Sequence, residues 1–237
     1  MSADEDRNSL LYWWPAVQRL GIPAPDTEIV MIPDGLLEGI LGHEPEKLAE
    51  AGWPKFFQAV ADAADRMGGY PVFLRTDILS GKHNWDDTCY VPSLRVLEKH
   101  IGALIEESYI PLGIPDPQAF VVREFLPLQS AFKAFHGLPI SLEWRLFAQD
   151  GELECLHFYW TPDAIKGWGR YKLPKDWKQQ LANLASIEPP VEVEAWARAV
   201  TKELGGAWSV DVACDMEGQW HLIDMAEAER NWHPGHA

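Results

Sequence analysis

The sequence AWSVDVACDMEGQWHLIDMAE, residues 207–227, predicts two β-strands joined by a short turn. Apolar and polar side chains alternate along each half, which is the period of a strand with one buried face. In the first half the alternating sets are Trp208, Val210 and Val212 against Ser209, Asp211 and Ala213. In the second half they are Trp220, Leu222 and Asp224 against His221, Ile223 and Met225. The stretch therefore predicts an antiparallel hairpin with aspartates among apolar residues.

Two aspartates of this hairpin, Asp211 and Asp224, are candidate metal ligands. If the turn has two or four residues, Asp211 lies opposite Leu222, and the aspartates are diagonal neighbours on one face, about 7–8 Å apart at the backbone. A three-residue turn with a bulge would break this register. Carboxylates at that spacing can share one magnesium ion, and Glu227 could add an oxygen ligand. The alternative is a solvent-facing strand with ordinary acidic side chains.

A second hairpin is predicted upstream, around an Asp-Gly turn at residues 150–151. Its first strand carries Arg145 in the middle, among apolar neighbours. An arginine in that position requires an anion, and its planar fork binds a phosphate or a carboxylate through two hydrogen bonds. The alternative is a local ion pair with Glu143 or Glu154.

Two further segments have the character of a nucleotide site. Arg75 closes a strand predicted over residues 70–76, and Ser80-Gly81-Lys82 follows in the loop. Glycine lets backbone N–H groups approach a phosphate, and lysine supplies charge, although the GxxxxGK[ST] spacing of a P-loop is absent. A strand predicted over residues 119–126 could present its end to a flat heterocycle. The alternatives are a solvated lysine and an ordinary buried strand.

The composition indicates a folded, acidic protein. Of 237 residues, 47% are hydrophobic and 24% are charged, and 20 Lys+Arg against 36 Asp+Glu give a formal net charge of −16. This excess repels nucleic-acid backbones and anionic lipids, so we expect no nucleic-acid or membrane partner. One basic cluster could hold an anionic substrate or form a solvated face: Lys166, Arg170, Lys172, Lys175 and Lys178.

Cysteine usage and the N-terminal residues favour a cytoplasmic protein. Cys89, Cys155 and Cys214 are far apart and lack the spacing of a zinc site, which favours three reduced, buried thiols. Residues 1–8 are polar and acidic, and no run approaches 18 apolar residues. We therefore expect neither a signal peptide nor a membrane span.

Predicted helices and strands interleave in both halves, which indicates an α+β protein with two lobes. A proline-rich break at residues 111–117 marks the expected boundary between the lobes. The expected division is a reduced N-terminal segment over 1–68, a small lobe over 69–117 and a large lobe over 118–237. Helices are predicted over residues 9–24, 36–41, 53–67, 94–108, 177–184 and 193–204.

The order of these pieces resembles the ATP-grasp superfamily over about residues 70–230. It is most similar to short ATP-grasp proteins of bacteria and phages, and to related eukaryotic cell-division-cycle proteins that assist initiation-factor assembly. The resemblance implies an ATP-grasp fold, in which two α+β lobes hold the nucleotide between antiparallel sheets. It is carried by Phe73-Leu74-Arg75, Ser80-Gly81-Lys82, Val122-Arg123-Glu124-Phe125-Leu126, Glu143-Trp144-Arg145-Leu146-Phe147, and Val210-Asp211-Val212 with Leu222-Ile223-Asp224-Met225.

The resemblance also implies roles for individual residues. Arg75 would meet the α-phosphate side of ATP, Lys82 would lie over the outer phosphates, and Arg145 would reach the γ-phosphate or an acyl-phosphate intermediate. Glu124 and the backbone of Phe125 and Leu126 would hold the adenine edge. The implied catalytic residues are Arg145 and Lys82. The implied ATP-binding residues are Arg75, Lys82, Arg123, Glu124, Phe125, Leu126 and Arg145, and the candidate magnesium ligands are Asp211, Asp224 and Glu227.

The chain departs from the family where many members read Glu-x-Asn and this one reads Asp224-Met225-Ala226, which leaves Glu227 as the candidate third ligand. The implied function is an ATP- and magnesium-dependent carboxylate–amine ligase that acts through an acyl phosphate on an unidentified carboxylate substrate. The alternative is an ATP-binding assembly factor without ligase turnover. In that case the Trp-rich N-terminal part, with Trp13 and Trp14, would be the interaction surface.

Overall fold

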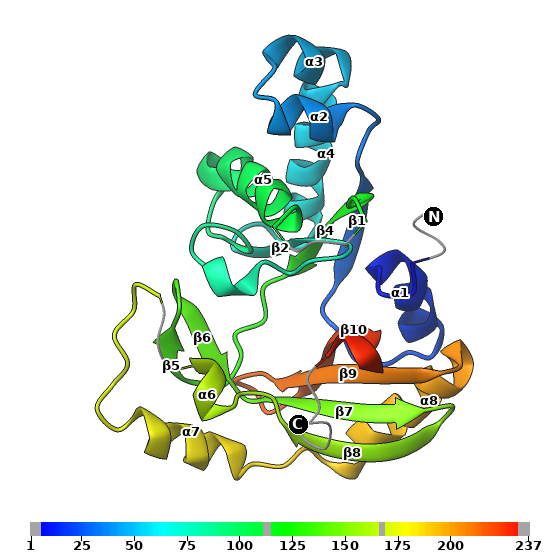
Figure 1. Cartoon of the computed structure of the whole chain (residues 1–237), viewed down its shortest axis with the longest axis vertical. Coiled ribbons are helices and arrows are strands. Elements are labelled where there is room, and N and C mark those ends of the chain that lie inside the picture. The colour runs from blue at the N-terminus through cyan, green and yellow to red at the C-terminus, as the bar shows by residue number, and fades with distance from the viewer. Residues whose placement is uncertain (1–5, 111–114, 166–168, 232–237) are drawn as a thin grey trace. The chain divides into compact units, whose positions relative to one another are not determined.

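The computed structural model describes residues 6–110, 115–165 and 169–231, which form two compact units (Figure 1). The smaller unit comprises the described residues within Asp26–Phe125 and Phe135–Leu138. The larger unit comprises those within Met1–Pro25, Leu126–Ala134 and Pro139–Ala237. Both contain helices and antiparallel sheet, so the α+β class predicted from the sequence is confirmed.

The smaller unit is built on a four-stranded antiparallel sheet in the order β1-β4-β2-β3. Its strands are β1 (Thr27–Met31), β2 (Val72–Thr76), β3 (Tyr90–Val91) and β4 (Ala119–Glu124). Its helices are α2 (Leu36–Leu41), α3 (Pro45–Glu50), α4 (Trp53–Arg66) and α5 (Leu94–Ser108). Apolar residues of α4 and α5 pack with Val72, Leu74 and Val122 in one buried core. Because side chains alternate along a strand, Arg75 and Arg123 lie on the opposite face of the sheet.

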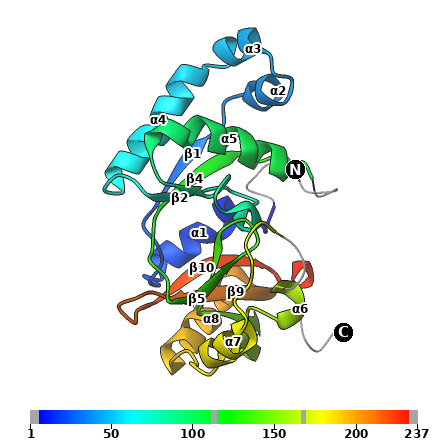
Figure 2. The same cartoon turned by 90° about the vertical axis from the view of Figure 1, so that its left-hand side faces the viewer.

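The larger unit contains a second four-stranded antiparallel sheet, in the order β10-β9-β7-β8. Its strands are β7 (Glu143–Gln149), β8 (Glu152–Phe158), β9 (Ala207–Cys214) and β10 (Trp220–Glu227). Helix α8 (Val191–Leu204) packs against one face of this sheet (Figure 2). That face carries Leu146, Val210 and Val212, which are fully buried, and Trp144, whose indole N–H donates to the Ile187 carbonyl at 3.0 Å.

The remaining elements of the larger unit are short. They are α1 (Leu10–Arg19), α6 (Pro162–Ile165), α7 (Trp177–Ala185) and the 3-10 helix η3 (Ala228–Arg230). Strands β5 (Ser130–Ala134) and β6 (Leu138–Ser141) form a separate two-stranded sheet. In none of the helices that the structure describes do length and apolar character suffice for a membrane crossing.

Most elements predicted from the sequence are present, with boundaries that differ by a few residues. Both predicted hairpins, β7–β8 and β9–β10, are formed. The sequence patterns do not predict α3, β5 or β6, which are only four to six residues long and lack a repeated period. Cys89, Cys155 and Cys214 are free, as expected.

The position of β4 differs from the division expected at residue 117. β4 pairs with β1 on one side and with β2 on the other, so backbone hydrogen bonds hold it in the smaller unit. The segment 118–237, expected as one lobe, therefore contributes a strand to the smaller unit. The expected N-terminal segment 1–68 also divides, after Pro25. Residues 111–114 of the expected boundary lie outside the described residues.

The Trp-rich N-terminal part is core, which corrects its expected role as an interaction surface. Trp13 is completely buried and Trp14 is 6% exposed. The preceding residue Arg7 fixes this segment to the sheet: its Nε forms an ion pair with Glu227 at 2.6 Å and its Nη2 donates to the Gly205 carbonyl at 2.6 Å. Its guanidinium also lies 4.9 Å from the ring centre of Trp208.

A buried aspartate organises the β9–β10 turn. Asp215 Oδ1 accepts hydrogen bonds from the backbone N–H groups of Glu217 (2.9 Å) and Gln219 (2.8 Å), and its Oδ2 is 2.8 Å from His221 Nε2. Burial opposes ionisation of Asp215, but the hydrogen bond from His221 and the two backbone donors outweigh it and lower the pKa. The carboxylate therefore stabilises the turn that joins the two strands.

Replacing Asp215 by alanine should lower the free energy of unfolding by about 1–3 kcal/mol at pH 7, because buried donors lose their acceptor. Since the folded-state pKa is lowered, this stabilisation exists above the ordinary aspartate pKa and is lost as pH falls through the folded value. The difference between the two proteins should therefore shrink below about pH 4. Urea denaturation across this range measures it. Glu217→Ala, at an exposed position of the turn, is the control, and equal stability of Asp215→Ala and wild type at pH 7 contradicts the role.

Candidate functional site

One residue from each strand forms a row across the sheet of the larger unit. Arg145 on β7 is paired with His157 on β8 and with Asp211 on β9, and Asp211 is paired with Asp224 on β10. Paired residues of antiparallel strands point to the same face of the sheet. These four residues, which we call the transverse row, lie on the face opposite α8, because Leu146 and Val210 alternate with them on the helix side.

The register of β9–β10 differs from the one expected from the sequence. Val212 is paired with Leu222, and a bulge at Ile223 then brings Asp224 directly opposite Asp211. The expectation that Asp211 faces Leu222 is therefore wrong. The two aspartates nevertheless share a face, as direct partners and not as diagonal neighbours, because the bulge advances β10 by one residue.

Arg145 and Asp211 form a two-pronged, buried ion pair. Arg145 Nε donates to Asp211 Oδ1 at 2.6 Å, and Nη2 donates to Oδ2 at 2.7 Å. The side chains are only 11% and 7% exposed. Burial disfavours the charged guanidinium, but the carboxylate of Asp211 outweighs this effect, and the pKa of Arg145 is raised. The local pairing with Glu143 or Glu154 weighed above is not formed in this arrangement, since Asp211 takes the guanidinium.

Glu227 is not brought to the two aspartates. It is paired with Trp208, which belongs to the other face of the sheet, and its carboxylate binds Arg7 and Asn8. Across residues 6–110, 115–165 and 169–231, no three His, Cys, Asp or Glu side chains gather closely enough to hold a metal ion. The protein oxygen donors of the transverse row are therefore two carboxylates.

Three residues near the row carry no signal in the sequence analysis. His157 lies beside Arg145, and the ring of Tyr159 lies 4.6 Å from the Arg145 guanidinium carbon. Asn231, just after η3, donates from its amide to Ser209 Oγ, two residues from Asp211 on the same strand face. Only the pairing of distant strands places these side chains near the row, so spacing in the sequence could not reveal them.

The helix-free face of the smaller unit's sheet carries arginines beside aromatic rings. Arg75 and Arg123 are 4% and 2% exposed and lie diagonally across β2 and β4. Phe73, directly opposite Arg123, belongs to a cluster of four half-buried rings with centroids 5.1–6.3 Å apart: Phe73, Trp85, Tyr90 and Phe125. This face combines flat apolar surface with guanidinium groups, which suits a base and its phosphates.

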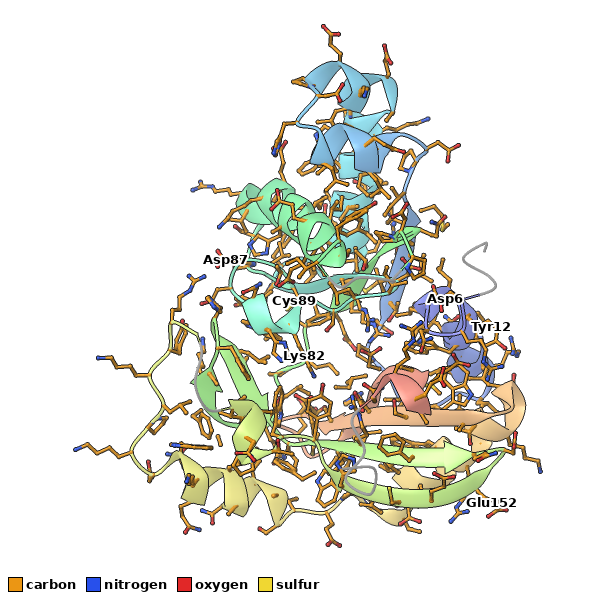
Figure 3. The ribbon with its side chains drawn as sticks, in the orientation of Figure 1. Asp6, Tyr12, Lys82, Asp87, Cys89 and Glu152 are labelled. Atoms are coloured by element: carbon orange, nitrogen blue, oxygen red, sulfur yellow. The ribbon has the colours of Figure 1, made fainter. Side chains whose placement is uncertain are left out.

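Lys82 lies in the 3-10 helix η2 (Lys82–Asn84), between β2 and β3 (Figure 3). Side chains hold this loop: Thr88 Oγ1 lies 2.7 Å from the Gly81 carbonyl oxygen and 2.8 Å from that of Asn84, and the Asn84 amide donates to Glu107 on α5. Gly81 adopts φ +62°, and a Cβ there would lie 2.6 Å from Leu104 Cδ2. Glycine is therefore required at the position before Lys82.

The predicted adenine segment lies at the division between the units, with Glu124 and Phe125 in the smaller unit and Leu126 in the larger. The Glu124 carboxylate is used locally: Oε1 accepts from the Asp26 backbone N–H at 3.0 Å. Each unit thus carries its own set of expected residues. The larger unit brings Arg145, Asp211 and Asp224 together, whereas Arg75, Lys82, Arg123 and Phe125 belong to the smaller one.

Comparisons with known proteins agree with this arrangement. The profile of an ATP-grasp domain, the third family of its clade, matches residues 66–232, more than half of the chain. No curated protein matches. C-terminally truncated Cdc123 from Schizosaccharomyces pombe is similar in structure, with a TM-score of 0.55 at 13% identity, over 93% of this chain and 83% of that one.

D-alanine–D-alanine ligase from Bacillus anthracis is also similar in structure. Its TM-score is 0.50 at 12% identity, over 95% of this chain and 58% of that one. Identities this low establish a shared fold. With the matching family profile, they show that this chain has the ATP-grasp fold and belongs to that clade family of the ATP-grasp domains.

Proposed function

We propose that the protein binds Mg-ATP and acts as a carboxylate–amine ligase through an acyl phosphate. The observation that carries the proposal is the transverse row, in which a guanidinium and two carboxylates from adjacent strands share one face of an ATP-grasp sheet. Phosphoryl transfer depends mostly on positioning and on charge neutralisation, so cations and a metal site serve it without a protein nucleophile.

Asp211 and Asp224 fit magnesium by their chemistry, as paired oxygen donors on adjacent strands. Magnesium is often bound by one or two carboxylates, with phosphate oxygens and water completing the octahedron. Two carboxylates without a third are therefore a sufficient protein contribution. When bound, the metal would neutralise charge on the outer phosphates. The Asn231 amide, close by at Ser209, replaces Glu227 as the candidate third ligand from the protein.

Arg145 would act on the phosphate that is transferred. Its fork matches a carboxylate in the structure and would match two oxygens of a γ-phosphate equally well. Binding of magnesium to Asp211 would compete with this ion pair and release the guanidinium toward the phosphate. Metal and nucleotide are then expected to bind cooperatively, because each supplies the partner that the other removes.

The smaller unit would bind the rest of the nucleotide. Arg75 and Arg123 are candidate contacts for the inner phosphates, and Lys82 for the outer ones. The rings of Phe73, Trp85, Tyr90 and Phe125 offer apolar surface for adenine. The Glu124 carboxylate is engaged with Asp26, so the adenine edge would be held mainly by the backbone of Phe125 and Leu126.

An ATP-binding assembly factor without turnover is the alternative, since the ATP-grasp fold is shared with Cdc123 and with ligases. Trapping of an acyl phosphate separates the two. In a ligase the substrate carboxylate attacks the γ-phosphorus and ADP leaves; added hydroxylamine then displaces phosphate and forms a hydroxamate. Free amino acids and glutamate-containing peptides are the substrates to screen. ATP binding without hydroxamate or ADP formation from any of them supports the assembly factor.

Asp224→Asn should weaken Mg-ATP binding about tenfold, or 1.4 kcal/mol, because the metal loses a charged ligand. Calorimetry with Mg-ATP, and with ATP in excess EDTA, measures the effect, which should disappear without magnesium. Glu227→Gln is the matched control on the opposite face and should leave the affinity unchanged. Equal losses in the two variants contradict the assignment.

Arg145→Ala should lower the free energy of unfolding by about 3–5 kcal/mol, because Asp211 is left buried without its partner. Magnesium without nucleotide should raise the melting temperature of this variant more than that of wild type, since the freed carboxylate can bind it. Differential scanning fluorimetry at matched ionic strength measures both. Arg145→Met with Asp211→Leu should recover stability and lose the magnesium effect. A variant as stable as wild type contradicts the structural role of the pair.

Lys82→Ala should weaken binding of ATP about tenfold and leave binding of AMP unchanged, because the lysine is assigned to the outer phosphates. Its stability should remain within about 0.5 kcal/mol of wild type, since a loop lysine contributes little to the core. Competition against a fluorescent nucleotide gives both affinities. Lys55→Ala, at an exposed position of α4, is the control. An equal loss for AMP places the lysine elsewhere on the nucleotide.

A further inference from the structure

Five exposed basic side chains gather around the start of α7 in the larger unit. They come from β5 and from the segment that leads into α7, and we call them the α7 basic surface: Lys133, Arg170, Lys172, Lys175 and Lys178. The Lys133 ammonium lies 5.8 Å from the ring centre of Tyr171, which brings β5 beside this segment. Lys166, the remaining member of the basic sequence cluster, lies outside the described residues.

The lysines of this surface differ from several other exposed cations in their pairing. Five exposed cations elsewhere each bind a carboxylate, in the pairs Arg19–Glu203, Lys47–Glu44, Arg66–Glu28, Lys99–Asp87 and Arg198–Glu152. In the described parts of the chain, no ion pair involves Lys133, Lys172, Lys175 or Lys178. The adjacent Asp176 accepts a hydrogen bond from Gln180 at 3.0 Å. Positive charge is therefore concentrated here in a chain of net charge −16.

Aromatic rings lie between these cations. Tyr171 is 37% exposed, and the half-buried Trp177 packs on Phe132 of β5, with ring centres 6.3 Å apart. The Lys178 ammonium lies 5.7 Å from the Trp177 ring centre. Tyrosine and tryptophan beside basic residues give a surface both apolar contact and charge, a combination enriched in protein interfaces.

We propose that the α7 basic surface binds an acidic stretch of a polypeptide. Ammonium groups at residues 172, 175 and 178 recur along the chain at a regular interval, so they match carboxylates spaced along a peptide. A nucleic acid fits less well, because its closely spaced phosphates would continue past these few cations over an acidic protein. If the function proposed above holds, the activated carboxylate belongs to a polypeptide; only that step rests on the proposed function.

Anisotropy of a fluorescent peptide of alternating Glu and Gly tests the proposal on the full chain, with the Gln-Gly peptide as the neutral probe. The Glu peptide should bind more tightly, and its affinity should fall between about 50 and 200 mM salt, because screening weakens exposed charges. Lys172→Glu with Lys175→Glu should lose about tenfold in affinity. The control Lys55→Glu with Arg95→Glu makes the same change in net charge at exposed sites on α4 and α5 and should lose less than about twofold.

Three results overturn the proposal: no binding of the Glu peptide at low salt, equal losses in the two double variants, or tighter binding of a single-stranded oligonucleotide of the same length. ATP binding is measured on the same preparations. It should be equal in both double variants, so a failure of nucleotide binding is distinguished from a failure of this surface.

Discussion

The ion pair between Arg145 and Asp211 is the constraint on which the face of the larger unit's sheet depends. Both groups are almost completely buried, and a charge in that position is tolerated only with a well-placed opposite charge. The fork requires β7 and β9 to be in register, so the pairing of the strands and the pairing of the charges enforce each other. The same two groups are chemically suited to phosphate and metal, which makes a structural pair and a functional pair out of the same atoms.

Bulges decide which side chains join that pair. The β7–β8 ladder shifts by one residue after Phe147, and this shift brings His157 opposite Arg145. The β9–β10 ladder shifts at Ile223, and without it Ile223 would stand opposite Asp211 while Asp224 would point to the helix side. Bulges re-aim side chains in this way, and here two of them gather ionisable groups into one row.

Much of the fold could be predicted from the sequence, because period and turn residues are local signals. The strand pairs around Asp150-Gly151 and 215–219 and the helices α4, α5 and α8 follow from such patterns. The position of β4 between β1 and β2 does not, because it joins segments about ninety residues apart. Predicting that Trp13 and Trp14 line a surface fails for a similar reason, since burial depends on neighbours that are distant in the chain.

The site was predicted in part for the same physical reason. Arg145, Asp211 and Asp224 are visible as charged residues inside apolar strands, which cost desolvation unless they have partners. Their partners, and the neighbours His157, Tyr159 and Asn231, come from other strands and could not be read from spacing. Glu227 shows the converse: it is close to Asp224 in sequence, yet an odd separation along β10 sends it to the opposite face, where Arg7 holds it.

The anchoring of the Lys82 loop has a thermodynamic consequence. A lysine on an unrestrained loop loses backbone freedom when it meets a ligand, at roughly 1–2 kcal/mol for each residue that becomes ordered. Here Gly81, Asn84 and Thr88 already hold the backbone around Lys82 in one conformation. Folding has thus met that entropic cost in advance, and most of the electrostatic attraction between the ammonium and an anion remains available as affinity.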